Sequence, residues 1–332
     1  MAARLSIGEL VDRGDLDELL RRVDDYCDDG EWQALLDLRD RCRAAFERGR
    51  QLWPAASHAE YRLALQAPGR WAAAVVTPGA GRFALGPLSE VAAATHTWDE
   101  LAAHLPATPE AGLVAQERVL RGEDLRADTR VDRAMVELPL VLLDAEPAYP
   151  EARYRPYAAE FDDVVAPATW ETVDVGVDGD RPAAVVADGD AERALVELAG
   201  AWTTQSNGQA VAVAVEGDAP GAVGALGVSG TVRVAEIDLA TALAILASTG
   251  ASGGAHGRRR GMAQGRFGAW WAAAALAGAL DDWPDVLDDA AEELRWYRWE
   301  RLELSAGWSL RIAAERPEDG RAFAVEATDR RS

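Results

Sequence analysis

The densest group of chemically versatile side chains lies at residues 250–271, which read GASGGAHGRRRGMAQGRFGAWW. Arginine pairs bidentately with phosphate and carboxylate groups, and histidine can donate a hydrogen bond or carry a proton. If the first glycines form a loop, their backbone amides would add an anion cradle ahead of a helix. The segment therefore predicts a site for a small anionic ligand, such as a nucleotide or a phosphorylated metabolite. Its candidate ligand-binding residues are His256, Arg258, Arg259, Arg260 and Arg266.

The same segment also fits a helix that packs closely through its glycines. Four glycines recur at intervals of four, at Gly253, Gly257, Gly261 and Gly265. Each step of four residues turns a helix by about 40°, so these positions would form one smooth stripe. Four interior glycines cost about 3–4 kcal/mol relative to alanine, and close approach by a neighbouring element is expected to offset that cost. Packing is the favoured interpretation, with Arg266 on the opposite side, one turn from Trp270 and able to form a cation–π contact.

A third interpretation is nucleophilic catalysis, because residues 250–254 match the G-x-S-x-G pattern around Ser252. That pattern needs a strand before the serine, whereas the preceding ATALAILAST is rich in alanine and predicts a helix. The only later histidine, His256, is too near in sequence to approach from a separate loop. We therefore assign no catalytic residue and do not expect an enzyme.

Composition excludes several other chemistries. The chain contains 34 basic residues, all of them arginine, which rules out lysine Schiff bases and Walker-type phosphate lysines. A formal net charge of −22 disfavours general nucleic-acid binding. His58, His96 and His104 lack partners at metal-ligand spacing, so we expect surface or capping roles and neither a metal nor a cofactor. Cys27 and Cys42 are expected to be reduced, buried thiols.

The elements that position these residues divide the chain into two parts. Apolar residues recur at helical spacing through residues 1–144, as in GDLDELLRRVDDYC and EWQALLDLRDRCRAAF, and prolines punctuate the segments. This pattern predicts a helical domain of stacked, alpha-solenoid-like pairs. Residues 145–168 are rich in proline and tyrosine and predict a connector, which the tyrosines pin to a surface.

Residues 169–332 change character and predict an α+β or mixed α/β domain with a mixed sheet. Strand-like segments include AVAVAVEG, TVRVAEID, GWSLRIAAE and RAFAVEA, and a long helical region is expected over 239–280. Asp190 is expected to cap the helix after the second strand. Trp296, Trp299 and Trp308 lie in the final strands, where core or inter-domain contacts are expected.

The N-terminus lacks an apolar core of signal-peptide length, and no apolar run is long enough to span a bilayer. These features predict a cytoplasmic protein that does not engage membranes.

The segments GASGGAHGRRRGMAQGRFGAWW, LRWYRWE and GWSLRIAAERPEDGRAFAVEATD resemble a family of uncharacterised proteins from high-GC, actinobacterial-type genomes. The resemblance covers mainly the C-terminal half and implies no activity or site.

Together these observations favour a non-enzymatic binding or scaffold protein whose helical half presents a surface to a protein partner. An anion-binding protein or enzyme that uses the cluster from Arg258 to Arg266 is the alternative.

Overall fold

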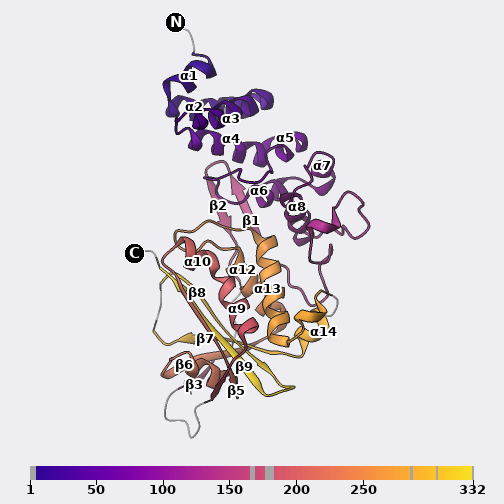
Figure 1. Cartoon of the computed structure of the whole chain (residues 1–332), viewed down its shortest axis with the longest axis vertical. Coiled ribbons are helices and arrows are strands. Elements are labelled where there is room, and N and C mark those ends of the chain that lie inside the picture. Colours follow the sequence, from indigo (N-terminus) through magenta and orange to yellow (C-terminus); the bar gives the residue numbers. More distant parts are fainter. Residues whose placement is uncertain (1–4, 165–168, 176–182, 285–286, 304–305, 331–332) are drawn as a thin grey trace. The chain divides into compact units, whose positions relative to one another are not determined.

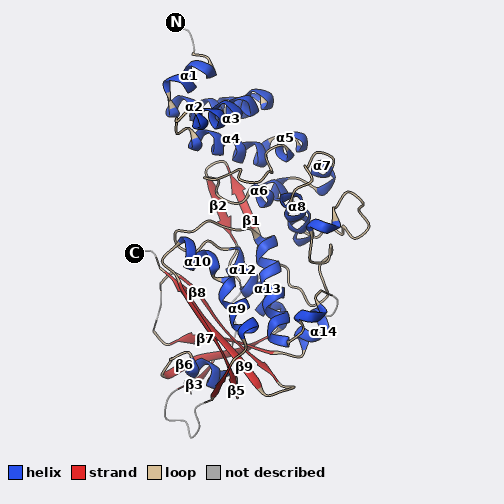
Figure 2. Ribbon diagram, viewed as in Figure 1, coloured by secondary structure: helices blue, strands red, loops and turns tan. Residues whose placement is uncertain are grey.

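The computed structural model describes residues 5–164, 169–175, 183–284, 287–303 and 306–330 (Figure 1). Within it the chain forms two compact units. The N-terminal unit comprises residues 1–141 and 152–161, and the C-terminal unit comprises residues 142–151 and 162–332. Figure 2 shows helices alone through the first 120 residues or so, and strands gathered mainly in the C-terminal unit.

The N-terminal unit is the predicted helical array. Helix α4 packs on α2 and α3 and also on α6, and α6 packs on α8, so contacts run along the array. Prolines mark the helix starts: Pro54 and Pro109 lie in the first turns of α4 and α8, where a missing amide hydrogen costs nothing. The helices are α1 (Ile7–Arg13), α2 (Leu16–Asp29), α3 (Trp32–Glu47), α4 (Trp53–Gln66), α5 (Gly69–Ala73), α6 (Leu88–Thr95), α7 (Trp98–Ala102), α8 (Pro109–Leu120) and the 3-10 turn η1 (Arg133–Met135).

The expected connector, residues 145–168, is divided between the units. Its middle forms a hairpin of β1 (Ala152–Arg155) and β2 (Ala158–Phe161) that belongs to the N-terminal unit. The sequence prediction missed this hairpin because its strands are only four residues long. The tyrosines do pin the segment: the Tyr154 hydroxyl donates to the buried carboxylate of Glu90 at 2.6 Å. Residues 165–168 lie outside the described part.

The C-terminal unit is built on a sheet, which confirms the α+β class. Among its described strands the sheet is antiparallel, whereas the sequence predicted a mixed sheet. Among the described residues, seven strands pair in the order β3-β6-β7-β8-β9-β5-β4, and every pairing is antiparallel. The strands are β3 (Glu171–Val175), β4 (Ala184–Val186), β5 (Gln209–Glu216), β6 (Gly230–Ile237), β7 (Arg295–Arg301), β8 (Trp308–Arg316) and β9 (Arg321–Asp329).

Helices cover both faces of this sheet. On one face α9 packs on β5 and β9, while α12 and α13 pack on β8. On the other face α11 contacts β3 as well as β5, β8 and β9, so the sheet must curl around it. Trp299 is fully buried in the core on that side, with Val215 and Val232. The helices are α9 (Gly189–Leu198), α10 (Gly200–Gln205), α11 (Ala219–Ala225), α12 (Leu239–Ala251), α13 (Met262–Ala277), the 3-10 turn η2 (Leu280–Asp282) and α14 (Leu287–Glu292).

Two local predictions in this unit differ from the structure. The helical region expected over 239–280 is interrupted, because α12 ends at Ala251 and α13 begins at Met262, so the alternative in which the first glycines form a loop is the one observed. The cap of α9 is Asp188, whose carboxylate accepts from the Ala191 amide, whereas Asp190 pairs with Arg193 at the surface. Both errors are boundary errors, and element ends are set by side-chain hydrogen bonds that periodicity does not reveal.

Candidate functional site

The glycines near position 260 do bring two pieces of backbone together, although not as one helical stripe. Only Gly265 of the four lies inside α13; Gly261 precedes the helix, and Gly253 and Gly257 lie in the loop before it. A Cβ atom at Gly265 would lie 2.1 Å from the carbonyl oxygen of Ala247 in α12, and one at Gly253 would lie 2.3 Å from that of Gly257. Close packing is therefore confirmed at these positions, and a continuous stripe is excluded.

The loop between α12 and α13 does not offer an amide cradle to an anion. The Ala255 amide donates to the carboxylate of Asp329 at 2.6 Å, and the His256 amide donates to the Ser206 hydroxyl at 3.1 Å. The Arg258 amide donates to the Gln205 side chain, and the Arg260 amide to the Ala251 carbonyl. Because oxygens of the protein itself accept these hydrogen bonds, the expected cradle is wrong.

Arg266 does not face a cleft. Its guanidinium is fully buried and forms a two-point ion pair with Glu146, with Nε–Oε1 at 2.7 Å and Nη2–Oε2 at 2.6 Å. Glu146 also accepts from the Trp270 indole and the Tyr149 hydroxyl, each at 2.8 Å. The expected contact between Arg266 and Trp270 thus runs through a shared carboxylate. A guanidinium occupied in this way supports the fold rather than an external ligand.

Electrostatics agree with that assignment. Burial alone would raise the pKa of Glu146, but the hydrogen bonds and charge of Arg266, the Leu143 amide and the Trp270 indole outweigh it and hold the pKa below its ordinary value. Glu146 is therefore ionised and neutralises Arg266 inside the unit.

The other predicted ligand residues are not gathered around a cavity with Arg266. His256, Arg258 and Arg260 are exposed and Arg259 is half-buried. The Arg260 guanidinium donates to the Gln264 side chain at 3.1 Å. The structure thus brings these side chains onto one exposed loop but separates them from the buried Arg266.

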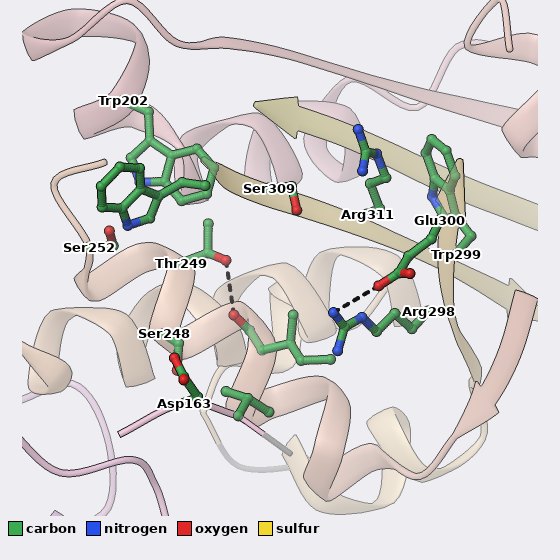
Figure 3. Close-up of a pocket in the computed structure, with 13 residues that line it drawn as sticks. Asp163, Trp202, Ser248, Thr249, Ser252, Arg298, Trp299, Glu300, Ser309 and Arg311 are labelled. Carbon is green, nitrogen blue, oxygen red and sulfur yellow. Dashed lines mark hydrogen bonds and ion pairs between the residues drawn. The ribbon is translucent and has the colours of Figure 1, made fainter. Parts of the chain in front are cut away.

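A cavity of about 450 Å³ does lie next to this loop, and Ser252 is part of its wall (Figure 3). It forms where two neighbouring strands separate: the β7–β8 ladder ends at the pair Arg298–Ile312, although β7 continues to Arg301 and β8 begins at Trp308. Residues of the separated ends form one side, and the end of α12 forms the other. The wall comprises Asp163, Val164, Trp202, Ile245, Ser248, Thr249, Ser252, Arg298, Trp299, Glu300, Trp308, Ser309 and Arg311.

Ser252 lacks the surroundings of a hydrolase nucleophile. It caps the C-terminal end of α12 rather than following a strand, and its hydroxyl accepts from the Gly254 amide at 3.0 Å. No histidine belongs to the described wall of the cavity. Ser252 is thus a polar wall residue.

The arginines of the wall share their carboxylate partners with other arginines. Glu300 pairs with Arg298 at 3.1 Å and with Arg233 at 2.6 Å. Glu326, which is not a wall residue, accepts from Arg311 and Arg301, each with its Nε at 2.9 Å. Burial opposes ionisation of Glu326, but these two arginines lower its pKa overall. Four arginines thus share two glutamates at the ends of these strands.

The N-terminal unit carries a different cluster of arginine and aromatic side chains, and this one faces outward. Phe46 lies 4.7 Å from Trp53 between ring centroids, and Arg82 lies over both Trp53 and Phe83 at 5.7 and 5.9 Å. Phe46 is 46% exposed and Phe83 is 60% exposed. We call these four residues, with the exposed Arg48 and Arg50 beside them in the chain, the aromatic–arginine patch.

The loop that carries Arg82 and Phe83 is anchored on both sides. The Gly81 amide donates to the buried carboxylate of Glu60 at 2.7 Å, and the Phe83 amide donates to the Ser57 hydroxyl at 2.8 Å. A Cβ at Gly81 would lie 2.7 Å from Leu88, so α6 packs directly on the loop. The patch is thus presented by an ordered backbone, which lowers the entropy lost on binding.

Sequence reasoning missed both the cavity and the patch. The patch joins the end of α3, the start of α4 and a loop after α5, and no single periodic segment contains it. The signal available was composition: RGRQLW and GRFAL place arginine beside large apolar residues between predicted helices.

The histidines and cysteines have structural surroundings. The His96 ring is buried and lies within hydrogen-bond distance of the Ala67 and Ala92 carbonyls, at 2.7 and 3.0 Å, which is the expected capping role. Both cysteines are free, and burial raises the pKa of Cys27 to about 11 and of Cys42 to about 12. Across the described residues, no group of three or more His, Cys, Asp or Glu side chains could hold a metal ion. Nor does any helix there have the length and apolarity to cross a membrane.

Comparison with known proteins gives one match. A family model described as "Family of unknown function (DUF6183)" matches residues 17–331, which extends the expected resemblance from the C-terminal half to nearly the whole chain. No curated protein and no solved structure matches the chain.

Proposed function

The chain belongs to this family of unknown function, and we propose that it is a cytoplasmic, non-enzymatic binding protein whose helical unit docks a protein partner. The single observation that supports this proposal is the aromatic–arginine patch. Tryptophan, aromatic and arginine side chains dominate the binding energy of protein interfaces. Here Phe46 and Phe83 are exposed on an anchored backbone, whereas large apolar side chains are ordinarily buried.

Charge indicates what kind of partner fits. Arg82 lies over the apolar rings, Arg48 and Arg50 are exposed beside Phe46 in the chain, and no carboxylate pairs with these three arginines among the described side chains. The chain as a whole carries a formal net charge of −22, so this basic surface contrasts with the rest. The partner we propose is an acidic segment of another protein that also presents apolar side chains.

The anion-binding alternative loses part of its basis. Arg266 is paired with Glu146, and the amides of Ala255, His256, Arg258 and Arg260 donate to oxygens of the protein itself. The predicted cluster of His256, Arg258, Arg259, Arg260 and Arg266 therefore does not converge on one anion. None of His256, Arg258, Arg259 and Arg260 belongs to the wall of the cavity beside the loop, and we therefore rank partner binding first.

The test compares two single substitutions in the full chain. Phe83→Ser removes the most exposed ring of the patch, and Val185→Ser is the matched control, because Val185 is 65% exposed but lies in the C-terminal unit. Each purified variant is immobilised and exposed to a lysate of the native host, and retained proteins are identified by mass spectrometry. A retained protein is then purified and its affinity is measured against all three chains.

The proposal predicts at least one acidic protein that wild type and Val185→Ser retain and Phe83→Ser loses, with affinity reduced about tenfold or more. Affinity should also fall as salt is added, because the contact is partly ionic. If Phe83→Ser retains the same set, the patch is not the docking surface. If the chain retains only further copies of itself, the patch is a self-association surface and the proposed partner is wrong.

A further inference from the structure

The tip of the β1–β2 hairpin is held against helices α2 and α4 by an exposed tyrosine. The Tyr157 hydroxyl donates to the Asp24 carboxylate of α2, and its ring stacks on His58 of α4, with 5.4 Å between the ring centroids. Tyr157 itself is 69% exposed. A second anchor is the Tyr61 hydroxyl of α4, which donates to the Arg155 carbonyl at 2.5 Å. A two-stranded hairpin is marginally stable by itself, so its order depends on such contacts.

The same hairpin supports the loop that presents the aromatic–arginine patch. A Cβ atom at Gly86 would lie 2.0 Å from the Tyr154 hydroxyl oxygen, so this tyrosine packs directly on the backbone of that loop. Gly86 follows Phe83 by three residues. The Phe83 amide donates to the hydroxyl of Ser57, the residue before His58 on α4. The loop is therefore held both by the hairpin and by the helix on which the hairpin tip is docked.

His58 is the member of this cluster that can change its charge near neutral pH. Its side chain is 17% exposed, and a charged or titratable group faces it from each of the three elements. On α2, Asp24 Oδ1 lies 3.9 Å from His58 Nε2. On α4, the buried Arg62 forms an ion pair with the same carboxylate, and on the hairpin Tyr157 covers the imidazole. Further groups near the tip are Asp28 and Arg155, which line the pocket there, and Cys27, whose thiol is neutral.

A proton on His58 is disfavoured while the tip is docked. Burial lowers the pKa of His58 most, the Arg62 charge lowers it further, and Asp24 offsets only part of this. Asp24 is already shared by Arg62 and the Tyr157 hydroxyl. Arg62 also lies over the Tyr157 ring, 5.7 Å from its centroid, so an imidazolium would be a second cation on that ring. His58 therefore binds a proton more tightly once the tip has left and water reaches the imidazole.

We propose that the β1–β2 hairpin is an acid-released clasp: proton uptake by His58 detaches the tip from α2 and α4 and loosens the loop that carries Phe83. Because the pKa of His58 is lowered from 6.5 in the docked state, docking is favoured above that value and weakens as the pH falls below it. Asp24 stays ionised in this range, since hydrogen bonds from Tyr157 and Arg62 outweigh burial and hold its pKa below 3.8. Any change in partner binding rests on the function proposed above, whereas the release itself does not.

Amide hydrogen exchange of the full chain, at about pH 7.5 and about pH 5.5, measures the release without a partner. Rates are converted to protection factors, which removes the intrinsic pH dependence of exchange. In wild type, protection of residues 152–161 should fall about threefold to tenfold in acid, because one pH unit below the ordinary pKa limits the effect to about tenfold. The amides of Gly81 and Phe83, which donate to Glu60 and Ser57, should lose protection in parallel. Helix α8 should not change.

Matched variants assign the effect to one imidazole. His58→Gln and His58→Phe cannot take up a proton, and the phenyl ring also keeps an aromatic face against Tyr157, so protection in both should vary by less than about 1.5-fold. His104→Gln is the control, because His104 is exposed in the same unit, and it should behave as wild type. Tyr157→Phe removes the hydroxyl that donates to Asp24, so it should lower protection about threefold or more at both pH values.

Four results would overturn the proposal. Equal protection of the hairpin at both pH values in wild type would show that acid does not release it. The same loss in His58→Gln and His58→Phe would place the titrating group elsewhere. An equal loss in α8 would mean that the whole unit unfolds in acid. Release of the hairpin with full protection of the Phe83 amide would separate the clasp from the loop.

Discussion

Two clusters of the same residue types have opposite roles in this protein. Around Arg266, an arginine, a tryptophan and a tyrosine converge on the buried carboxylate of Glu146. Around Arg82, an arginine lies against Trp53 and Phe83, and the phenyl ring is 60% exposed. Both clusters combine a guanidinium with large aromatic side chains.

The difference between them is an internal carboxylate. Glu146 pairs with Arg266 at two points inside the fold, so its cluster is closed and stabilises the C-terminal unit. In the patch the guanidinium contacts ring faces alone among the described residues, which leaves its hydrogen-bond donors to a partner. Arginine beside aromatics is therefore a binding signal only when no acidic side chain of the same chain completes the cluster.

The largest loss of stability is expected when the ion pair between Arg266 and Glu146 is broken. Glu146→Gln removes the carboxylate that forms a two-point ion pair with the buried Arg266 guanidinium, and should lower the free energy of unfolding by about 3–5 kcal/mol at neutral pH. Urea denaturation of both chains measures this difference. A loss below about 1 kcal/mol would contradict the assignment of a closed ion pair.

The same pair predicts a pH dependence. Because the folded pKa of Glu146 lies below its ordinary value of 4.5, its ionisation contributes stability that is present above that value. This contribution is lost as the pH falls through the lowered pKa. The gap between wild type and Glu146→Gln should therefore narrow in acid, and a gap that widened would refute the sign of the shift.

A smaller loss is expected from Trp270→Phe. This change removes the indole N–H that donates to Glu146 at 2.8 Å, and hydrogen bonds to charged groups contribute about 1.5–3 kcal/mol. Trp53→Phe in the patch is the matched control, since Trp53 is half-buried. Equal losses of stability in Trp270→Phe and Trp53→Phe would contradict the difference drawn between the two clusters.

The next loss of stability is expected at Gly265, where α13 packs closely against α12. Gly265→Ala places a methyl group 2.1 Å from the Ala247 carbonyl oxygen and should cost about 1–3 kcal/mol by overpacking. On the same helix, a Cβ at Gly268 meets only Leu198, at 3.2 Å. Thermal melts should therefore place Gly268→Ala much closer to wild type than Gly265→Ala.

The smallest change in stability is expected in the aromatic–arginine patch. Phe83→Ser should change the free energy of unfolding by no more than about 0.5 kcal/mol, because the ring is largely exposed. Denaturation at equilibrium checks this directly. A large loss would mean that the ring is part of the core, and the patch would then resemble the Arg266 cluster.

Much of the local structure could be predicted. Helical spacing in residues 16–46 locates α2 and α3, and alternation of apolar and polar residues locates β5, β6, β8 and β9. Each element buries one face, so the period of its apolar residues can be recognised within a short segment. Composition likewise excluded lysine chemistry. The end of α12 was not predictable in this way, since ATALAILASTG and the residues of α13 are equally rich in alanine and glycine.

The sequence alone therefore determined which segments are helices and strands, and which side chains can carry charge or accept a proton. Only the tertiary structure decided which charged side chains form ion pairs inside the fold. Arg266 meets a carboxylate 120 residues away, and the cavity exists because β7 and β8 separate beyond Arg298. Periodicity is a property of neighbours along the chain, whereas the partner of a charge depends on which faces pack together, and that choice is made by the whole fold.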